Sequence, residues 1–515
     1  MKKTENIINL IQSLSKSEKR YFKLFVAKNS KGESNHFIKL FDIIDKLGTA
    51  EKNTIRKFYG DEKFMKGLFR LYKIRLYDQI LNSLSAYHSE QLIDDKILQS
   101  IRKAKILYDK FLYSDAEKIF AKAKIMASKY EKHTLLLEIN YWQKKIISTP
   151  SAELESYKEA KINQLIEEEK LTINKIENNT VFWKQKALIF NIYMSKGIAR
   201  VQEDIDQYNS IINAPVLRNQ MMLSYDAKSN FYAMYTTYFF ATHNLNEAYK
   251  YAKKAIELND THPYQIESNP WGYSTILHNF LLITHRLKKH EEFFSMLSKL
   301  KSLLQKFKPP LPMKIRFYNL EFTAYLDIGH FKKAARLLSI VETTLADQKN
   351  MPEGAKIIFV LDKSLLYFFI KEYHKALIGL NEILNNEKSY LAQDRYTFAK
   401  LLQLIIHFEK GNMDFLPHLL KSLYKYLIQK KKLYKIENLL IQFVRTILAI
   451  KSNKEQIEVF KTFKKELTSI YNDPLEANFL NFFDAVSWLE SKIENRPFEE
   501  ILREKSGYSL EEEND

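Results

Sequence analysis

Residues Tyr113-Ser-Asp-Ala116-Glu-Lys-Ile-Phe120-Ala-Lys-Ala123 contain the pattern on which most of the chain is built. A small residue, Ala116, follows an aromatic residue by three positions and precedes apolar residues by four and seven positions. Offsets of four and seven fall on one face of an α-helix, because each turn takes about 3.6 residues. A small side chain lets a neighbouring helix approach closely, and the larger ones fill the space beside it. The stretch therefore predicts a helix that packs on another helix.

The same pattern recurs along the chain at a nearly constant interval. If the residue equivalent to Ala116 is called the anchor, successive anchors from position 204 onward are 44, 45, 41, 42, 40 and 40 residues apart. Such a period is typical of helical-repeat proteins, in which each helix pair packs only on its neighbours. We therefore predict an all-α array of antiparallel helix pairs. The further anchors are Ala248, Phe293, Ala334, Ala376 and Leu416, with weaker copies at Asp204 and Gln456.

Several copies resemble the second half of a tetratricopeptide repeat, notably Tyr113-x-x-Ala116-x-x-x-Phe120 and Gly329-x-Phe331-x-x-Ala334. The resemblance covers about residues 95–470. It implies a right-handed superhelical array, an α-solenoid, in which the first helix of each pair lines a concave face. The period of 40–45 residues is longer than the family's, which is about 34. The family's first-helix Trp and Leu-Gly pair are mostly absent, so longer helices or loops are expected.

We predict three parts in the chain. Residues 1–92 lack the repeat and form a basic N-terminal helical bundle, residues 93–472 form the array, and residues 473–515 form a C-terminal capping helix pair with an acidic tail. Asp473 and Pro474 predict the start of the first capping helix, because Asp is a good N-cap and Pro a good first helical residue. Ser15 and Glu18 fit a capping box at the start of an N-terminal helix.

The composition argues against several classes of protein. There is no cysteine, which excludes disulfides and thiolate catalysis and favours a reducing compartment. No two glycines are closer than Gly60 and Gly67, which excludes a P-loop and a dinucleotide fingerprint. The histidines are scattered, and nothing indicates a catalytic group. The N-terminus lacks a signal peptide, and the longest uncharged spans contain polar residues. We therefore expect a cytoplasmic, non-enzymatic protein without cofactor, metal or membrane insertion.

The formal net charge of +18 raises the question of nucleic-acid binding. Of the 80 basic residues, 66 are Lys and 14 are Arg, although Arg is the usual reader of phosphates and base edges. A basic excess lies in residues 1–90 and an acidic excess in residues 473–515. Ends of opposite charge suggest docking of a partner, although solvated surfaces have the same pattern. Nucleic acid is therefore a possible partner but not the favoured one.

One alternative reading makes the protein a DNA-binding regulator. The turn at Gly48 has the length of the turn in a helix-turn-helix, and the helix after it offers polar and basic residues to a groove of DNA. In that reading the array would sense a peptide or another partner. A third reading, an RNA-associated scaffold, would use lysine-rich second helices such as residues 421–435. The residues that would read DNA are Lys52, Asn53, Arg56 and Lys57.

The favoured prediction is a non-catalytic scaffold or adaptor that binds a protein or peptide in its groove. The resemblance implies that groove positions lie 18, 15, 11, 8 and 7 residues before each anchor. In the middle of the array these positions are polar and basic, whereas elsewhere they are mainly apolar, as at Leu361, Leu365 and Phe368. Arg can hold a peptide carboxylate through two parallel hydrogen bonds, and Asn can hold the peptide backbone. The predicted partner-binding residues are Asn230, Thr237, His278, His285, Arg286, Arg316, Asn319 and Thr323.

Overall fold

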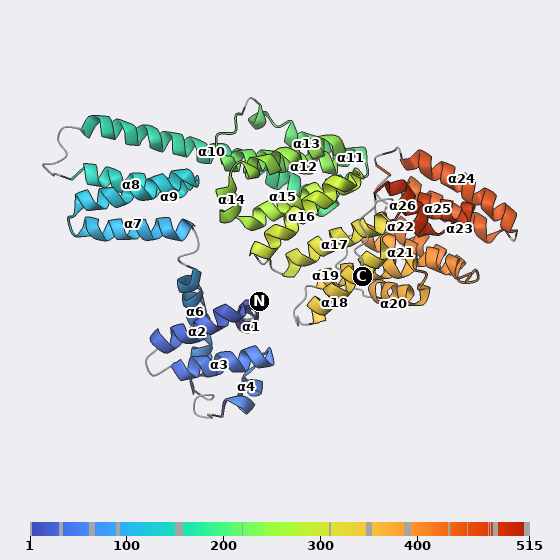
Figure 1. The fold of residues 1–515 in the computed structure, drawn as a ribbon, viewed down its shortest axis with the longest axis horizontal. Coiled ribbons are helices and arrows are strands. Elements are labelled where there is room, and N and C mark those ends of the chain that lie inside the picture. Colours follow the sequence, from blue (N-terminus) through green and yellow to red (C-terminus); the bar gives the residue numbers. More distant parts are fainter. Residues whose placement is uncertain are drawn as a thin grey trace. The chain divides into compact units, whose positions relative to one another are not determined.

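The computed structural model is all-α, and the residues that it describes contain no strand. They form two compact units, residues 1–174 and 175–515, with the boundary inside helix α10 (Lys158–Lys196) (Figure 1). The three-part division predicted from the sequence stays a prediction. The described residues are 3–29, 34–60, 67–88, 93–149, 158–218, 220–307, 309, 311–346, 353–385, 393–430, 433–450, 452–471, 473, 475–476 and 483–508.

The first unit begins with a small helical bundle that has its own core. Phe22, Phe41 and Ile44 are fully buried there, and the rings of Phe22 and Phe41 lie 4.6 Å apart. The predicted capping box is confirmed, since the Ser15 amide donates to the Glu18 carboxylate and the Glu18 amide to Ser15 Oγ. The helices of this bundle are α1 (Lys3–Ser13), α2 (Lys16–Asn29), α3 (Ser34–Leu47), α4 (Lys52–Tyr59) and α6 (Phe69–His88).

A second core in the first unit contains the stretch that defines the repeat. Ala116, Phe120 and Ala123 are buried against helices on either side, as the spacing predicts. The first half of α10 buries Leu165 and also makes ion pairs, since Lys124 pairs with Glu168, and Lys144 Nζ lies 2.7 Å from a Glu169 oxygen. The other helices of this core are α7 (Ile93–Asp109), α8 (Tyr113–Lys129) and α9 (His133–Ile147).

The second unit is an array of helix pairs joined by short turns (Figure 1). The second half of α10 opens it. Short helices, α14 (Pro263–Ser268) and the 3-10 helix η2 (Pro215–Leu217), lie in two of the connections. The remaining helices are α11 (Gln202–Ile212), α12 (Tyr225–Ala241), α13 (Leu245–Asp260), α15 (Pro270–Arg286), α16 (His290–Phe307), α17 (Leu311–Asp327), α18 (Phe331–Ala346), α19 (Glu353–Phe369), α20 (Tyr373–Leu384), α21 (Gln393–Glu409), α22 (Leu416–Gln429), α23 (Lys435–Leu448) and α24 (Asn453–Tyr471).

The anchors occupy the interior of these pairs. Ala248, Ala334, Ala376 and Leu416 are completely buried, so the predicted helical repeat is confirmed in this unit. The two weaker anchors, Asp204 and Gln456, are partly exposed. In those two copies the position four residues further on is still buried, as Tyr208 and Phe460.

The C-terminal helices, α25 (Ala485–Glu494) and α26 (Phe498–Ser506), differ from the sequence prediction in where they begin. Asp484 is the N-cap of α25 and accepts a hydrogen bond from the Ser487 amide at 2.9 Å. At the helix start predicted for Asp473 and Pro474, residues 475–476 form a turn, and Pro474 lies outside the described residues. Asp473 instead accepts hydrogen bonds from the Leu475 amide and from Lys435 Nζ.

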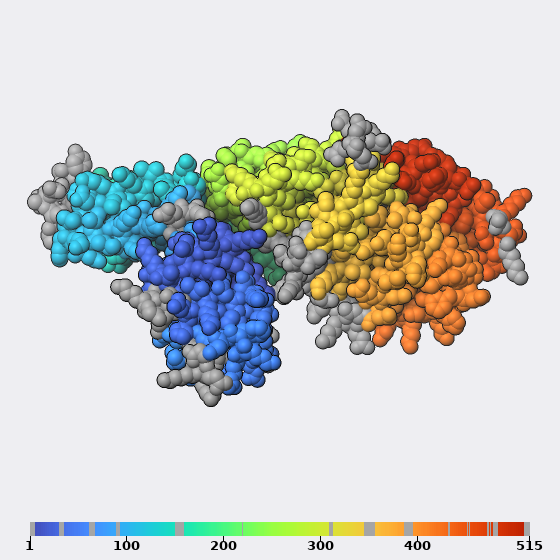
Figure 2. Space-filling view, turned by 60° about the horizontal axis from the view of Figure 1, so that its bottom comes forward, coloured from blue at the N-terminus to red at the C-terminus, as the bar shows by residue number. Residues whose placement is uncertain are grey.

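These C-terminal helices pack along the turns that join the two helices of successive pairs. Trp488 Nε1 donates to Glu409 at the end of α21, and Arg503 Nε donates to the carbonyl of Gly329 at 3.0 Å. The ring of Tyr508 stacks on Phe294 at the start of α16. In Figure 2 the C-terminal residues, drawn in red, lie against the yellow and orange helices of the same unit. The array is therefore covered at its turns by its own last helices.

Candidate functional site

Three arginines from three different helices act electrostatically on one tyrosine in the second unit. Tyr193 comes from α10, Arg286 from α15, Arg316 from α17 and Arg395 from α21. Burial raises the pKa of the Tyr193 phenol, and the charges of all three guanidinium groups oppose that rise. A charge shifts a pKa in this way only when it lies near the titrating group. Helices far apart in sequence therefore bring three positive charges to one region of the array, which we call the arginine cluster.

His278 lies beside this cluster as a neutral acceptor. Burial, with a further contribution from the nearby Arg316, lowers the pKa of His278 to about 4. The imidazole is therefore uncharged at neutral pH and can accept a hydrogen bond from Arg316 Nη2, which lies 3.4 Å from His278 Nδ1. The Arg316 side chain remains exposed. Its other guanidinium nitrogens are thus available to an anionic ligand.

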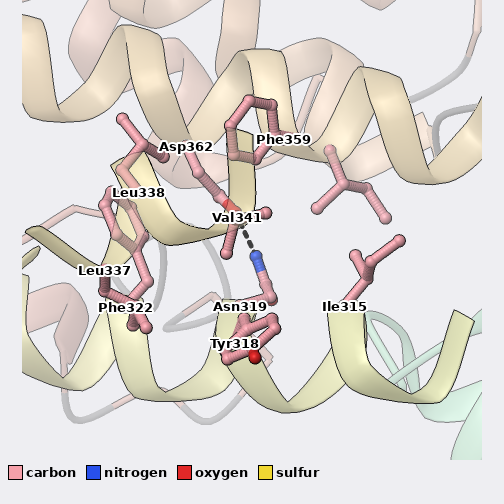
Figure 3. A pocket seen from close by; sticks show the side chains of 10 residues that line it. Ile315, Tyr318, Asn319, Phe322, Leu337, Leu338, Val341, Phe359 and Asp362 are labelled. Atoms are coloured by element: carbon pink, nitrogen blue, oxygen red, sulfur yellow. Dashed lines mark hydrogen bonds between the residues drawn. The ribbon is translucent and has the colours of Figure 1, made fainter. Parts of the chain in front are cut away.

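A carboxyl group, Asp362 of α19, faces the cluster from the next helix pair. Asn319 Nδ2 donates to Asp362 Oδ2 across the gap between α17 and α19 (Figure 3). Burial raises the pKa of Asp362 to about 7, against the opposing effects of Arg395 and of the Asn319 hydrogen bond. The carboxyl group is therefore close to half ionised at neutral pH. The small pocket around the pair is otherwise lined mainly by apolar side chains: Ile315, Tyr318, Phe322, Leu337, Leu338, Val341, Ile358 and Phe359.

Four of the predicted site residues are engaged within the chain. The Asn230 side chain accepts from Lys186 Nζ and donates to Asn179. Thr237 and Thr323 each donate to a carbonyl of their own helix. His285 Nε2 lies 2.8 Å from Asp327 Oδ2. Of the eight predicted residues, His278, Arg286, Arg316 and Asn319 are those brought to the cluster.

Three residues of the cluster were not selected from the sequence. Asp362 and Arg395 lie outside the positions that the tetratricopeptide spacing picks, whereas Tyr193 lies at one of them, 11 residues before the weaker anchor Asp204. In α19 that spacing selects Leu361 and Leu365, which are buried in the core. In the sequence, Asp362 stands out only as a charged residue next to an apolar position that is expected to be buried. A charged residue in that place is usually exposed to solvent, so nothing in the sequence favoured its selection.

The alternative nucleic-acid residues lie together on α4. Lys52, Asn53, Arg56 and Lys57 are all exposed, and the same helix buries Ile55 and Tyr59 in the bundle core. The buried face of α4 thus leaves its basic face to solvent. Among the described residues, no group of acidic and histidine side chains could hold a metal ion, and no helix is long and apolar enough to cross a membrane.

No protein-family model and no curated protein matches the sequence. Among solved structures, the chain is similar to a Signal Transduction ATPase with Numerous Domains (STAND) protein with a tetratricopeptide repeat sensor from Pyrococcus horikoshii. The identity is 15% and the TM-score 0.31, over 84% of this chain and 55% of that protein. The chain thus spans about half of that protein's length.

Proposed function

We propose that the protein is a non-catalytic helical-repeat scaffold that binds a protein or peptide partner in the second unit. The observation that carries this proposal is the arginine cluster, in which Arg286, Arg316 and Arg395 reach one region from separate helices. Like charges that lie close together favour the binding of an anion between them. Asp362, a buried carboxyl group whose pKa is lowered by Arg395 and raised more strongly by burial, lies on the next helix pair.

The ligand group that fits this cluster is a carboxylate of the partner. An arginine guanidinium holds a carboxylate through two parallel hydrogen bonds, and neutral His278 helps to orient Arg316 for that role. Modest contacts along several helix pairs would add to this central interaction. No step of this proposal requires a cofactor or metal.

The test is the loss of a purified partner on charge reversal within the cluster. The partner is obtained from an extract of the native host with the full chain, and its affinity is then measured by calorimetry. Arg286→Glu combined with Arg316→Glu should weaken binding about a hundredfold or more, because arginines often contribute much of the binding energy of an interface and the reversed charges would repel a carboxylate. The matched control is Lys454→Glu combined with Lys465→Glu, which reverses the charges of two exposed residues on α24. Undiminished binding by the folded double variant would contradict the proposal.

The DNA-binding alternative rests on the exposed basic face of α4. It predicts retardation of a DNA duplex by the full chain, with a steep dependence on salt concentration. Lys52→Glu combined with Lys57→Glu should abolish the retardation, and the Arg286 and Arg316 variants should leave it unchanged. A partner that binds in the second unit gives the reverse pattern, so the two experiments distinguish the two functions.

A further inference from the structure

A hollow of about 310 Å³ lies between α16 and α17 in the second unit. Each of these helices packs mainly on another one, α16 on α15 and α17 on α18, so the two leave a hollow where they face each other. Its floor is apolar, because Leu297, Leu300 and Phe317 line it and are buried. Small-molecule sites typically have volumes of about 300–1,000 Å³. The hollow therefore has room for a small ligand with an apolar body.

One wall of the hollow is formed by a carboxylate that is almost completely buried. The side chain of Glu321 is only 5% exposed. Lys301 Nζ and the Tyr325 hydroxyl both donate to the same oxygen, Glu321 Oε1, each at 2.7 Å. None of the described residues donates to the second oxygen, Oε2. An acceptor in such a place without a donor costs free energy, so it favours a ligand that brings a donor group.

A lysine lies at the other end of the hollow. Lys314 and Glu321 are seven residues apart on α17, which places them on one face of the helix and about 10 Å apart along its axis. Lys314 is half-buried, and no acidic residue within the described ranges pairs with it. Phe317 and Tyr318 lie between the two charged residues on the same face. The hollow thus offers a hydrogen-bond acceptor at one end, an ammonium group at the other and apolar surface between them.

We propose that this hollow binds a short apolar peptide of two or three residues with free termini. The peptide's ammonium group donates to Glu321 Oε2, its carboxylate accepts from Lys314 Nζ, and its side chains cover the apolar floor. An extended chain spans at most about 3.3–3.6 Å per residue, so two or three residues bridge roughly 7–11 Å. A fatty acid would satisfy only the lysine, and an alkylamine would satisfy only the carboxylate. The order of groups along the hollow therefore favours a ligand that has both charges.

This site is separate from the arginine cluster, since Arg286, Arg316 and Arg395 do not line the hollow. The inference therefore goes beyond the proposed function and does not depend on it. The purified protein partner tests the cluster, and small synthetic peptides test the hollow. Failure of either experiment leaves the other proposal standing.

The test uses the full chain with leucyl-leucine and trileucine, each also as the N-acetyl derivative and as the C-terminal amide. Isothermal titration calorimetry measures the affinities. At least one free peptide should bind, and each of its blocked forms should bind at least about tenfold more weakly, because one end of the hollow then lacks its counterpart. Equal binding of the N-acetyl form or of the amide would overturn the inference, because the site would then recognise one charge only. Absence of binding by both free peptides would also overturn it.

Two variants assign each end of the peptide to a residue. Glu321→Gln keeps an oxygen that can accept from Lys301 and Tyr325 but removes the negative charge. The free peptide should then bind about tenfold or more weakly, no better than its N-acetyl derivative. Lys314→Met should likewise remove the preference for the free peptide over its amide. The matched control, Lys332→Met, replaces an exposed lysine of α18 and should leave every affinity unchanged.

Thermal unfolding checks that each variant is folded. No described side chain depends on Lys314 for a hydrogen bond or ion pair, so Lys314→Met decides the matter even if Glu321→Gln unfolds. A folded Lys314→Met variant that keeps the full preference for the free peptide over its amide would place the peptide elsewhere. That result would overturn the inference.

Discussion

Arg200 Nη2 lies 3.4 Å from both carboxylate oxygens of Glu437, although the two residues are 237 positions apart. The two side chains are only 9% and 4% exposed, and the guanidinium lies 4.0 Å from the ring centre of Tyr434. A second carboxylate, Glu476, accepts hydrogen bonds from the amides of residues 435 and 436 and lies 3.7 Å from Arg200. The segment before α11 is thereby joined to the start of α23.

Arg200→Met should strongly destabilise the protein. Two buried carboxylates would then face each other without their cation, and the free energy of unfolding should fall by roughly 3–5 kcal/mol. Urea unfolding measures the change. The control is Arg496→Met, which breaks an exposed ion pair with Glu504 and should cost less than about 1 kcal/mol. Equal effects of the two variants would mean that the buried contact contributes little.

Asp362→Asn should change how stability depends on pH. The pKa of Asp362 is raised to about 7, so the folded state binds a proton that the unfolded state releases at lower pH. The stability from this proton is present at low pH and is lost as the pH rises through 7. Asn stays uncharged, so the variant should gain stability relative to the natural protein between about pH 4 and pH 7, the interval between the unfolded and folded pKa values of Asp362. The prediction is wrong if the free energies of unfolding of the variant and of the natural protein change with pH in parallel.

Ala376→Phe should destabilise α20, because Ala376 is completely buried between paired helices. Overpacking of this kind costs roughly 1–3 kcal/mol. Ile378→Phe is the control on the same helix, since Ile378 is 57% exposed and should tolerate the change within about 0.5 kcal/mol. Thermal unfolding of the two variants gives the comparison. A neutral result for Ala376→Phe would place the anchor outside the helix interface.

Gly379→Ala should destabilise the protein even though Ala favours a helix by about 1 kcal/mol over Gly. A Cβ at this position of α20 would overlap Ser364 Oγ and would lie 3.2 Å from Val360 Cγ1 of α19. The close approach of these two helices therefore requires glycine. The double variant with Ser364→Ala removes the overlapping oxygen and should recover part of the loss. Stabilisation by Gly379→Ala alone would mean that the helices move apart freely.

Gly329→Ala and Gly411→Ala should differ in their cost. Both glycines have left-handed backbone conformations, with φ of 71° and 72°, in equivalent turns between paired helices. At Gly411 a Cβ would meet nothing, so the cost is the conformational one of about 1–2 kcal/mol. At Gly329 the Cβ would lie 2.7 Å from the Glu499 carbonyl oxygen of α26, so the loss should be larger. Equal losses of stability in the two variants would mean that α26 moves away from the added Cβ without a cost in free energy.

The fold could be predicted because it depends on a local pattern that repeats. Each anchor, such as Ala248 or Ala334, has its apolar neighbours at fixed offsets on one helix face, so the sequence contains the helix pairing directly. The contact between Arg200 and Glu437 has no such local pattern. The start of α25 was also missed, because Asp473 and Asp484 are equally good caps by residue type. Burial of Trp488 and Leu489 favours the later one.

The candidate site was predicted only in part, for a geometric reason. Neighbouring positions on a helix differ by about 100° in direction, so an error of one residue exchanges a groove position for a core position. The tetratricopeptide spacing selects Arg316 in α17, but in α19 it selects Leu361, whereas Asp362 is the residue that accepts the hydrogen bond from Asn319. Arg395 also lies off the selected positions, whereas Tyr193 lies at one of them, 11 residues before the weaker anchor Asp204.

The position of the C-terminal helices affects the order in which the second unit can be completed during synthesis. Helices α17–α22 leave the ribosome before α25 and α26 have been made. Until then Phe369 lacks the rings of Phe483 and Phe498, which lie 6.1 Å and 5.2 Å away in the finished fold. Uncovered aromatic surface of this kind attracts other nascent chains. The second unit therefore has a vulnerable interval in the cell, which closes when α26 reaches the Gly329 turn.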